Sequence, residues 1–231
     1  MIDRRTLAHL LVLLCLACSF TAAAQTPPSA RDVEAYPPLF LAVVNADQAA
    51  LQSALADNED IDARDDHGRS ALHVAAFYAN HAAMRALVAA GADANALEDD
   101  YYDIATIAAV ADDVDTLRLA LRIGCSPANI TSRYHGTALI AAAHLGHVEI
   151  VETLIDAGAP LDHVNNLGWT ALIESIVLGD GGARHSATLQ ALVEAGADVN
   201  LADGSGQTPL QLATERGYTG MARILRSAGG K

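Results

Sequence analysis

Two histidines at a helical spacing, His144 and His147, are the first residues whose types and positions suit metal chemistry. Two acidic clusters, 65–67 (Asp-Asp-His) and 98–100 (Glu-Asp-Asp), offer carboxylates that calcium would accept. However, the two histidines have no further ligands near them in sequence to complete a tetrahedral set, and neither cluster has the alternating spacing of an EF-hand loop. We therefore expect structural roles for these residues and predict no metal or other cofactor.

Three other segments resemble catalytic sites only in part. Ser205 lies between two glycines, but without the spacing of a nucleophile elbow. The glycine-rich stretch 179–182 lacks the Lys-Ser/Thr pair with which a phosphate-binding P-loop continues. Cys125 is the one cysteine outside the first 24 residues, so it has no partner for an intramolecular disulfide there. The sequence thus predicts a protein that is not an enzyme.

The elements that must carry these residues are short amphipathic helices in a repeating unit. In the segment 136–162, Thr137 can cap a first helix, and Gly146 supplies the positive φ at which that helix ends. Apolar residues then recur at spacings of three and four, and Gly158 ends a second helix. Because two such helices cannot bury their apolar faces alone, they require neighbours stacked on both sides.

Six units share this register. The first core residue of each first helix is Leu39, Leu72, Ala105, Leu139, Leu172 or Leu210, at separations of 33, 33, 34, 33 and 38. The second helices end at Asn58, Gly91, Gly124, Gly158, Gly196 and Gly229. The third unit departs most from the pattern, so its geometry is the least securely predicted. The fifth carries about five additional residues near 181–185.

The chain resembles the ankyrin-repeat family over residues 36–231. The matching segments are Ser70-Ala71-Leu72-His73, Gly91-Ala92-Asp93-Ala94-Asn95, Thr137-Ala138-Leu139 with Gly146-His147, Gly196-Ala197-Asp198-Val199-Asn200, and Thr208-Pro209-Leu210. The resemblance implies an all-α solenoid of six helix-turn-helix units joined by β-turn fingers. We place the units at about 36–64, 65–97, 98–131, 132–164, 165–202 and 203–231. Polar residues on the outer faces of the two terminal units favour a monomer.

The first 24 residues have the three parts of a secretory signal peptide: Arg4 and Arg5, an apolar run over 7–20, and Ala22-Ala23-Ala24. We predict cleavage after Ala24, which places the protein in the periplasm or outside the cell. Lipidation at Cys18 is the less favoured alternative, because the residues before it match a lipobox only in part. No later segment is long and apolar enough to span a membrane. Residues 25–35 have no apolar period and are expected to be a flexible tether.

The net charge of −14 indicates the class of binding partner. An acidic surface repels phosphate backbones and attracts basic protein surfaces. We therefore expect a protein partner with a basic surface in the region of contact, and no nucleic acid.

Aromatic residues concentrate in the turns between units and at the ends of first helices, the places that line the concave binding face in ankyrin proteins. Tyrosine and tryptophan away from charge are typical of interface hot spots. Our candidate partner-binding residues are Tyr36, Arg69, Phe77, Tyr78, Tyr101, Tyr102, Tyr134, His144, Trp169, Val177 and Leu178.

The favoured function is therefore a non-enzymatic binding module that is exported and holds another protein in its concave groove. The resemblance extends to bacterial periplasmic ankyrin proteins that assist an exported enzyme such as a catalase. Two alternatives stay open at this point. One is an immunity protein that masks a toxin, and the other is an enzyme or metal-dependent protein with a site in the groove near His144, Tyr134 and Trp169.

Overall fold

The computed structural model describes residues 27–57 and 59–231. The expected signal peptide and the helix end at Asn58 lie outside these residues. The helices are α2 (Ala30–Ala35), α3 (Pro38–Val44), α4 (Gln48–Ala56), α5 (Ala71–Phe77), α6 (His81–Ala89), α7 (Ile104–Val110), α8 (Val114–Arg122), α9 (Ala138–Leu145), α10 (Val148–Asp156), α11 (Ala171–Val177), α12 (Ala183–Glu194), α13 (Pro209–Glu215) and α14 (Thr219–Ser227).

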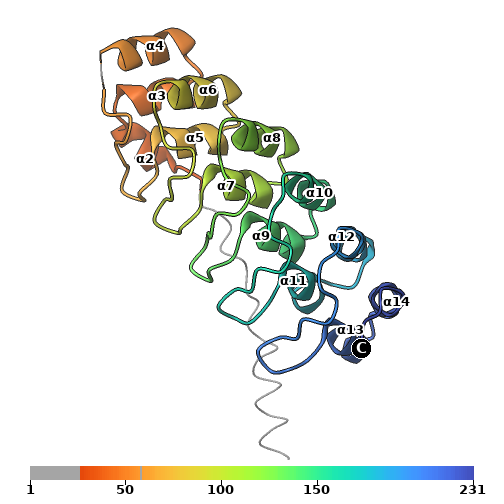
Figure 1. Cartoon of the computed structure of the whole chain (residues 1–231). Coiled ribbons are helices and arrows are strands. Elements are labelled where there is room, and N and C mark those ends of the chain that lie inside the picture. Colours follow the sequence, from red (N-terminus) through yellow and green to blue (C-terminus); the bar gives the residue numbers. More distant parts are fainter. Residues whose placement is uncertain (1–26, 58) are drawn as a thin grey trace, which may run out of the picture.

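Six helix pairs, from α3 with α4 to α13 with α14, stack into a curved solenoid (Figure 1). The first helices pack on one another as one layer and the second helices as another. Between the pairs, long loops project together along one edge (Figure 1). The described residues contain no strand, and their one isolated bridge pairs Thr131 with Gly136. The prediction of an all-α repeat solenoid is therefore confirmed.

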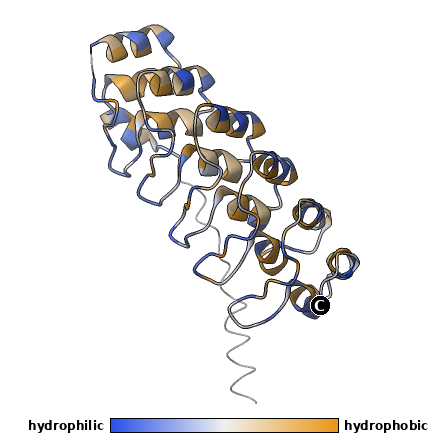
Figure 2. Ribbon diagram, in the orientation of Figure 1, coloured by the Kyte–Doolittle hydropathy of each residue, from blue (hydrophilic) through white to orange (hydrophobic). Residues whose placement is uncertain are grey.

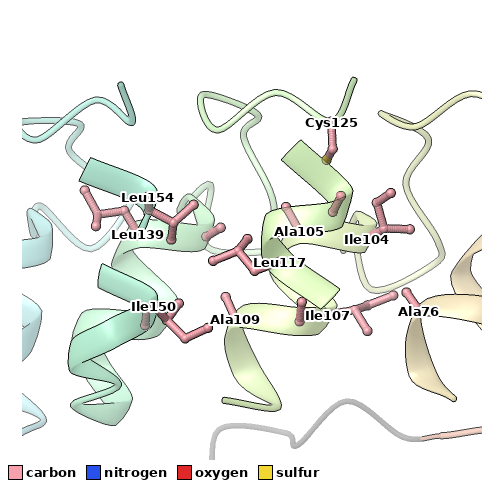
Figure 3. Close-up of a cluster of buried hydrophobic side chains, with 14 of the residues drawn as sticks. Ala76, Ile104, Ala105, Ile107, Ala109, Leu117, Cys125, Leu139, Ile150 and Leu154 are labelled. Carbon is pink, nitrogen blue, oxygen red and sulfur yellow. The ribbon is translucent and has the colours of Figure 1, made fainter. Parts of the chain in front are cut away.

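The core runs the length of the stack as a continuous apolar layer between helices. Of the six register residues, Leu39, Leu72, Ala105, Leu139 and Leu172 are at most 1% exposed, and Leu210 of the last unit is half-buried. The first helices are mostly apolar, whereas the second helices combine apolar and polar residues (Figure 2). Leu117 of α8 and Ile150 of α10 lie in the cluster between the third and fourth units (Figure 3). No helix among residues 27–57 and 59–231 has the length and apolar character needed to cross a membrane.

The third unit, whose sequence departs most from the repeat pattern, is as regular as the others. Its first helix is capped by Asp103, whose side chain accepts a hydrogen bond from the Thr106 amide, and its second by Asp113, which accepts from Thr116. Aspartate is as effective an N-cap as threonine, so the altered sequence keeps the same helix ends.

The segment expected to be a tether is partly helical. Ser29 and Asp32 form a reciprocal capping box at the start of α2, each side chain bonding the other residue's backbone amide. The Ser-x-x-Asp spacing that produces this box is a known helix-start pattern. Residues 30–35 thus differ from the sequence expectation, because the cap and a distant ion pair described below fix them.

The additional residues of the fifth unit lengthen α12 and link it to neighbouring units. The guanidinium of Arg184 pairs with Asp112 of the third unit at 3.0 Å. His185 Nε2 donates to the carbonyl of His144 at 2.9 Å, and the Tyr218 hydroxyl donates to the Gly179 carbonyl at 3.0 Å. The insertion therefore connects units three to six.

The turn between the first and second helices requires a left-handed residue. Gly146 and Gly217 fill this place in two units, whereas Ala46, Ala79 and Asp112 fill it elsewhere, with φ of 52°, 49° and 58°. A side chain costs about 1–2 kcal/mol in this conformation, which exceeds the entropic cost of glycine. We expect Ala79→Gly to raise the free energy of unfolding by about 0.5–1 kcal/mol, measured by urea denaturation.

A matched control separates strain from a general effect of glycine. Ala187 is exposed within α12, so Ala187→Gly should lower stability by about 1 kcal/mol. If both substitutions destabilise alike, Ala79 is not strained.

Candidate functional site

The fingers between units are built on one recurring hydrogen-bond pattern. Seven residues before the register residue of units two to six, a polar side chain accepts hydrogen bonds from the backbone amides two and four residues later. In Asp65, one oxygen binds the amides of His67 and Arg69 at 2.9 and 3.0 Å. Glu98, Ser132, Asn165 and Asp203 repeat the pattern. The acidic clusters thus hold the finger backbone, as the sequence predicted.

Backbone hydrogen bonds also join one finger to the next. The amide of Ser132 donates to the carbonyl of Tyr101 at 3.1 Å, and the amide of Asn166 donates to Tyr134 at 2.9 Å. The amide of Asp99 donates to His67 in the same way. Residues at the tips therefore form a continuous surface rather than independent loops.

Two of the predicted contact residues, Tyr36 and Arg69, are buried instead of exposed. Arg69 is 2% exposed, and its guanidinium contacts Asp65 at 2.7 Å and Asp32 at 2.9 Å. The Tyr36 hydroxyl donates to Asp65 at 2.9 Å, while its ring packs against Phe40. These side chains join α2 and α3 to the first finger, so burial gives them a structural position.

The electrostatics of this cluster follow from its pairing. A backbone hydrogen bond from Ser29 and the Arg69 guanidinium lower the pKa of Asp32 from 3.8 to about 2. Burial raises the pKa of Asp65, but hydrogen bonds from the His67 amide and from Arg69 more than offset it, and the net shift is downward. Burial, helped by the Asp65 carboxylate, raises the pKa of the Tyr36 hydroxyl. Both carboxylates are therefore ionised at neutral pH.

The remaining predicted contacts are at least partly accessible. Tyr101 is 54% exposed, and Tyr78 and Tyr134 are each 42% exposed. Phe77, Tyr102, His144, Trp169, Val177 and Leu178 are half-buried. The pair Phe77 and Tyr78 ends α5, whereas Val177 and Leu178 end α11, so two units separate these pairs.

The structure adds three exposed apolar residues that the sequence analysis missed. Ile130 is 54% exposed, and Val164 and Leu167 are each 45% exposed. Together with Tyr101 and Tyr134 they occupy three consecutive fingers. We call these five residues the fingertip patch. The sequence criterion was aromatic character, so these three aliphatic residues did not meet it. Their apolar character among polar finger residues is the signal that would have identified them.

His144 faces a buried carboxylate that the sequence analysis also missed. Its Nδ1 lies 3.9 Å from Glu174 Oε2, and Glu174 is only 4% exposed. The Asn165 amide donates to Glu174 Oε1 at 2.9 Å, while Oε2 has no hydrogen-bond partner among the described residues. Burial raises the pKa of Glu174 from 4.5 to about 7, and burial followed by the nearby His185 and His147 lowers that of His144.

The other chemistry-bearing residues have structural partners. His147 Nδ1 donates to the Ala109 carbonyl at 2.8 Å. His73 Nε2 donates to Ala96 at 3.0 Å while Nδ1 contacts Ser70, and burial lowers its pKa to about 4. The Cys125 thiol is buried, which raises its pKa and leaves it protonated. Within the described part of the chain, no three His, Cys, Asp or Glu side chains gather closely enough to hold a metal ion.

Models of ankyrin repeats match most of the solenoid. A three-copy ankyrin-repeat model matches residues 105–203, a many-copy model matches 183–226, and a single-repeat model matches 67–96. The ankyrin repeat protein YahD of Escherichia coli K12 is 45% identical over 89 residues, which span 38% of this chain and 44% of YahD. The match thus covers less than half of that relative.

Solved structures extend the likeness over the whole array. An ankyrin repeat domain from Acinetobacter baumannii AYE is 44% identical, with a TM-score of 0.77, covering 84% of this chain and 98% of that one. A chain in the complex of the endopeptidase Bd0816 of Bdellovibrio bacteriovorus with the immunity protein Bd3460 is 22% identical, with a TM-score of 0.68, covering 83% and 98%. The second likeness concerns the fold alone.

Proposed function

Because the chain belongs to the ankyrin-repeat family, an interaction scaffold, we propose that it is an exported binding module that holds a protein partner across its fingers and first helices. The observation that carries the proposal is the fingertip patch, five exposed apolar residues on three adjacent fingers of a chain with a net charge of −14. Contiguous apolar surface on an otherwise charged protein marks an interaction site.

The proposal includes a location and a class of partner. The signal-like first 24 residues support export with cleavage after Ala24, and the mass of the purified protein tests this. The acidic surface favours a partner with a basic region, bound by a single copy of this chain. An exported enzyme is the first partner to test, with catalase as the specific candidate because of the family resemblance.

Affinity capture from a periplasmic extract, with the purified protein as bait, tests the function. We expect Trp169→Ala or Tyr78→Ala to weaken binding of the captured partner at least tenfold, about 1.4 kcal/mol, because partly exposed aromatic rings supply most of the energy at interface hot spots. Arg85→Ala, on the exposed side of α6, should leave binding unchanged.

The identity of the captured partner and the behaviour of the variants each test part of the proposal. A captured toxin would favour the immunity role over the accessory role. Equal binding by parent and variants would remove these rings from the interface. Variants that unfold would show instead that the rings belong to the core.

A further inference from the structure

Two fingers place large side chains where the other fingers have glycine. Four residues before the register residue, the backbone is left-handed in five successive fingers, and Gly68, Gly168 and Gly206 fill the place in three of them. Tyr101 and His135 fill it in the other two, with φ of 68° and 54°. A side chain is disfavoured in this left-handed conformation, so neither residue is explained by folding stability.

The two strained residues line the same pocket. A cavity of about 350 Å³ lies between the fingers 98–102 and 130–136, lined by Tyr101, Ile130, Ser132, Arg133 and His135. Ser132 is also left-handed, with φ of 65°, so three of the six non-glycine residues with positive φ in the described chain border this one cavity. Strained backbone that clusters in this way is typical of binding sites.

The walls of the pocket are held in place by bonds between the two fingers. The Ser132 amide donates to the Tyr101 carbonyl at 3.1 Å, and Arg133 forms an ion pair with Asp100 across the gap. The volume, about 350 Å³, is at the lower end of the range for ligand sites and is large enough for one apolar side chain of a partner.

The surroundings of the pocket specify the chemistry of the occupant. Tyr101 and Ile130 give the walls an apolar character, each with 54% of its surface exposed. On the N-terminal side, Asp66 and Asp99 are exposed carboxylates, and Arg133 already pairs with the neighbouring Asp100. On the C-terminal side, residues 163–169 contain no acidic residue and expose two apolar side chains of the fingertip patch. The surface therefore changes from acidic to apolar across the pocket.

We propose that the pocket between these two fingers receives an aliphatic or aromatic side chain from an extended segment of a protein partner, with a lysine or arginine of that segment over Asp99. The inference rests on the proposed binding function and adds the anchor and the orientation of the bound segment. The cation of the bound segment faces Asp99 on the N-terminal side of the pocket, and the further apolar residues of the segment face Val164 and Leu167. Charge and burial are complementary only in that direction.

A random peptide library displayed on phage, selected on the purified protein, tests the proposal. We expect enriched peptides with a large apolar residue, a lysine or arginine within three residues on one side, and a second apolar residue on the other. In fluorescence anisotropy with an enriched peptide, Tyr101→Gly and Ile130→Ser should each weaken binding at least tenfold. Arg85→Ala, on the exposed side of α6 and outside the fingers, should change it less than twofold.

Tyr101→Gly has a second readout, because glycine relieves the strain while it removes the ring. The melting temperature should stay within about 2 °C of the parent or rise. A fall of more than about 4 °C would make the ring structural and overturn the proposal. Enriched peptides that bind both pocket variants like the parent, or a library that yields no common pattern, would also overturn it.

The same variants separate this inference from the broader function. If a captured partner binds Tyr101→Gly and Ile130→Ser as tightly as the parent but loses affinity for Trp169→Ala, the binding function stands and the pocket does not. If no partner is captured and no peptide pattern appears, both fail.

Discussion

Replacing Arg69 with alanine is expected to lower the free energy of unfolding by about 4 kcal/mol, because it leaves two carboxylates without their cation. The guanidinium is 2% exposed and contacts both Asp65 and Asp32, which are 7% and 18% exposed in their side chains. Breaking such a pair from one side costs more than the pair contributes, since the remaining charges stay buried. Urea denaturation at pH 7, with the slope compared between variants, measures the loss.

The control is Arg85→Ala, an exposed arginine on α6, which should change stability by less than about 0.5 kcal/mol. A loss below about 1 kcal/mol for Arg69→Ala would show that water solvates the carboxylates easily and that the cluster does not hold α2.

The same cluster gives stability an acid-sensitive component. Because the pKa of Asp32 is about 2 in the folded protein against an ordinary 3.8, the unfolded chain binds its proton first as pH falls. Ionised Asp32 therefore contributes its full share to the free energy of unfolding above about pH 4, and this share is lost as pH falls from 4 towards 2.

Periodicity predicted the fold because each unit repeats the same burial pattern, and five of the six register residues are buried in the core. The environments of single side chains were harder to predict when their partners lie far away in sequence. The sequence places Arg69 at a variable position of a finger, and its burial becomes evident only when Asp32, 37 residues earlier, is placed beside it. Tyr36 was predicted to be an accessible aromatic residue because its hydrogen bond to Asp65 is not evident from the sequence.

A comparison of units at one register position would have found more of the site. Two residues after the register residue, the other five units have Leu41, Val74, Ile107, Ala141 and Leu212, whereas the fifth has Glu174. The glycine place at the fingertips reveals Tyr101 and His135 in the same way. In contrast, the pocket and the lack of a hydrogen-bond partner for Glu174 Oε2 in the described residues depend on distances between units, which the sequence of a single repeat does not encode.

The fifth unit compensates for its buried acid with an amide. Seven residues before the register residue, the second, third and sixth units have the acids Asp65, Glu98 and Asp203. The fifth unit has Asn165 there, and its Nδ2 donates to Glu174 Oε1. A carboxylate at 165 would instead repel Glu174. Because His144 is held neutral by burial and by the neighbouring His185 and His147, it supplies no counter-charge at pH 8.

Glu174→Gln is therefore expected to stabilise the protein by roughly 2 kcal/mol at pH 8, since one pKa unit corresponds to about 1.4 kcal/mol and burial carries the carboxyl pKa from 4.5 to about 7. The folded protein binds this proton more tightly than the unfolded chain, so stability falls as pH rises from 4.5 to 7, and the full penalty applies above pH 7. Glutamine keeps an oxygen for the Asn165 amide and carries no charge.

The pH dependence of the gain distinguishes charge from packing. At pH 5 the parent carboxyl is protonated in the folded state, so the stabilisation by Glu174→Gln should shrink to well under half of its value at pH 8, as measured by urea denaturation at both pH values. Glu152→Gln makes the same chemical change on the exposed face of α10 and should alter stability little at either pH. A gain that is equal at pH 5 and pH 8 would assign the effect to packing, and a loss at pH 8 would mean that the ionised carboxylate has a stabilising partner in solution.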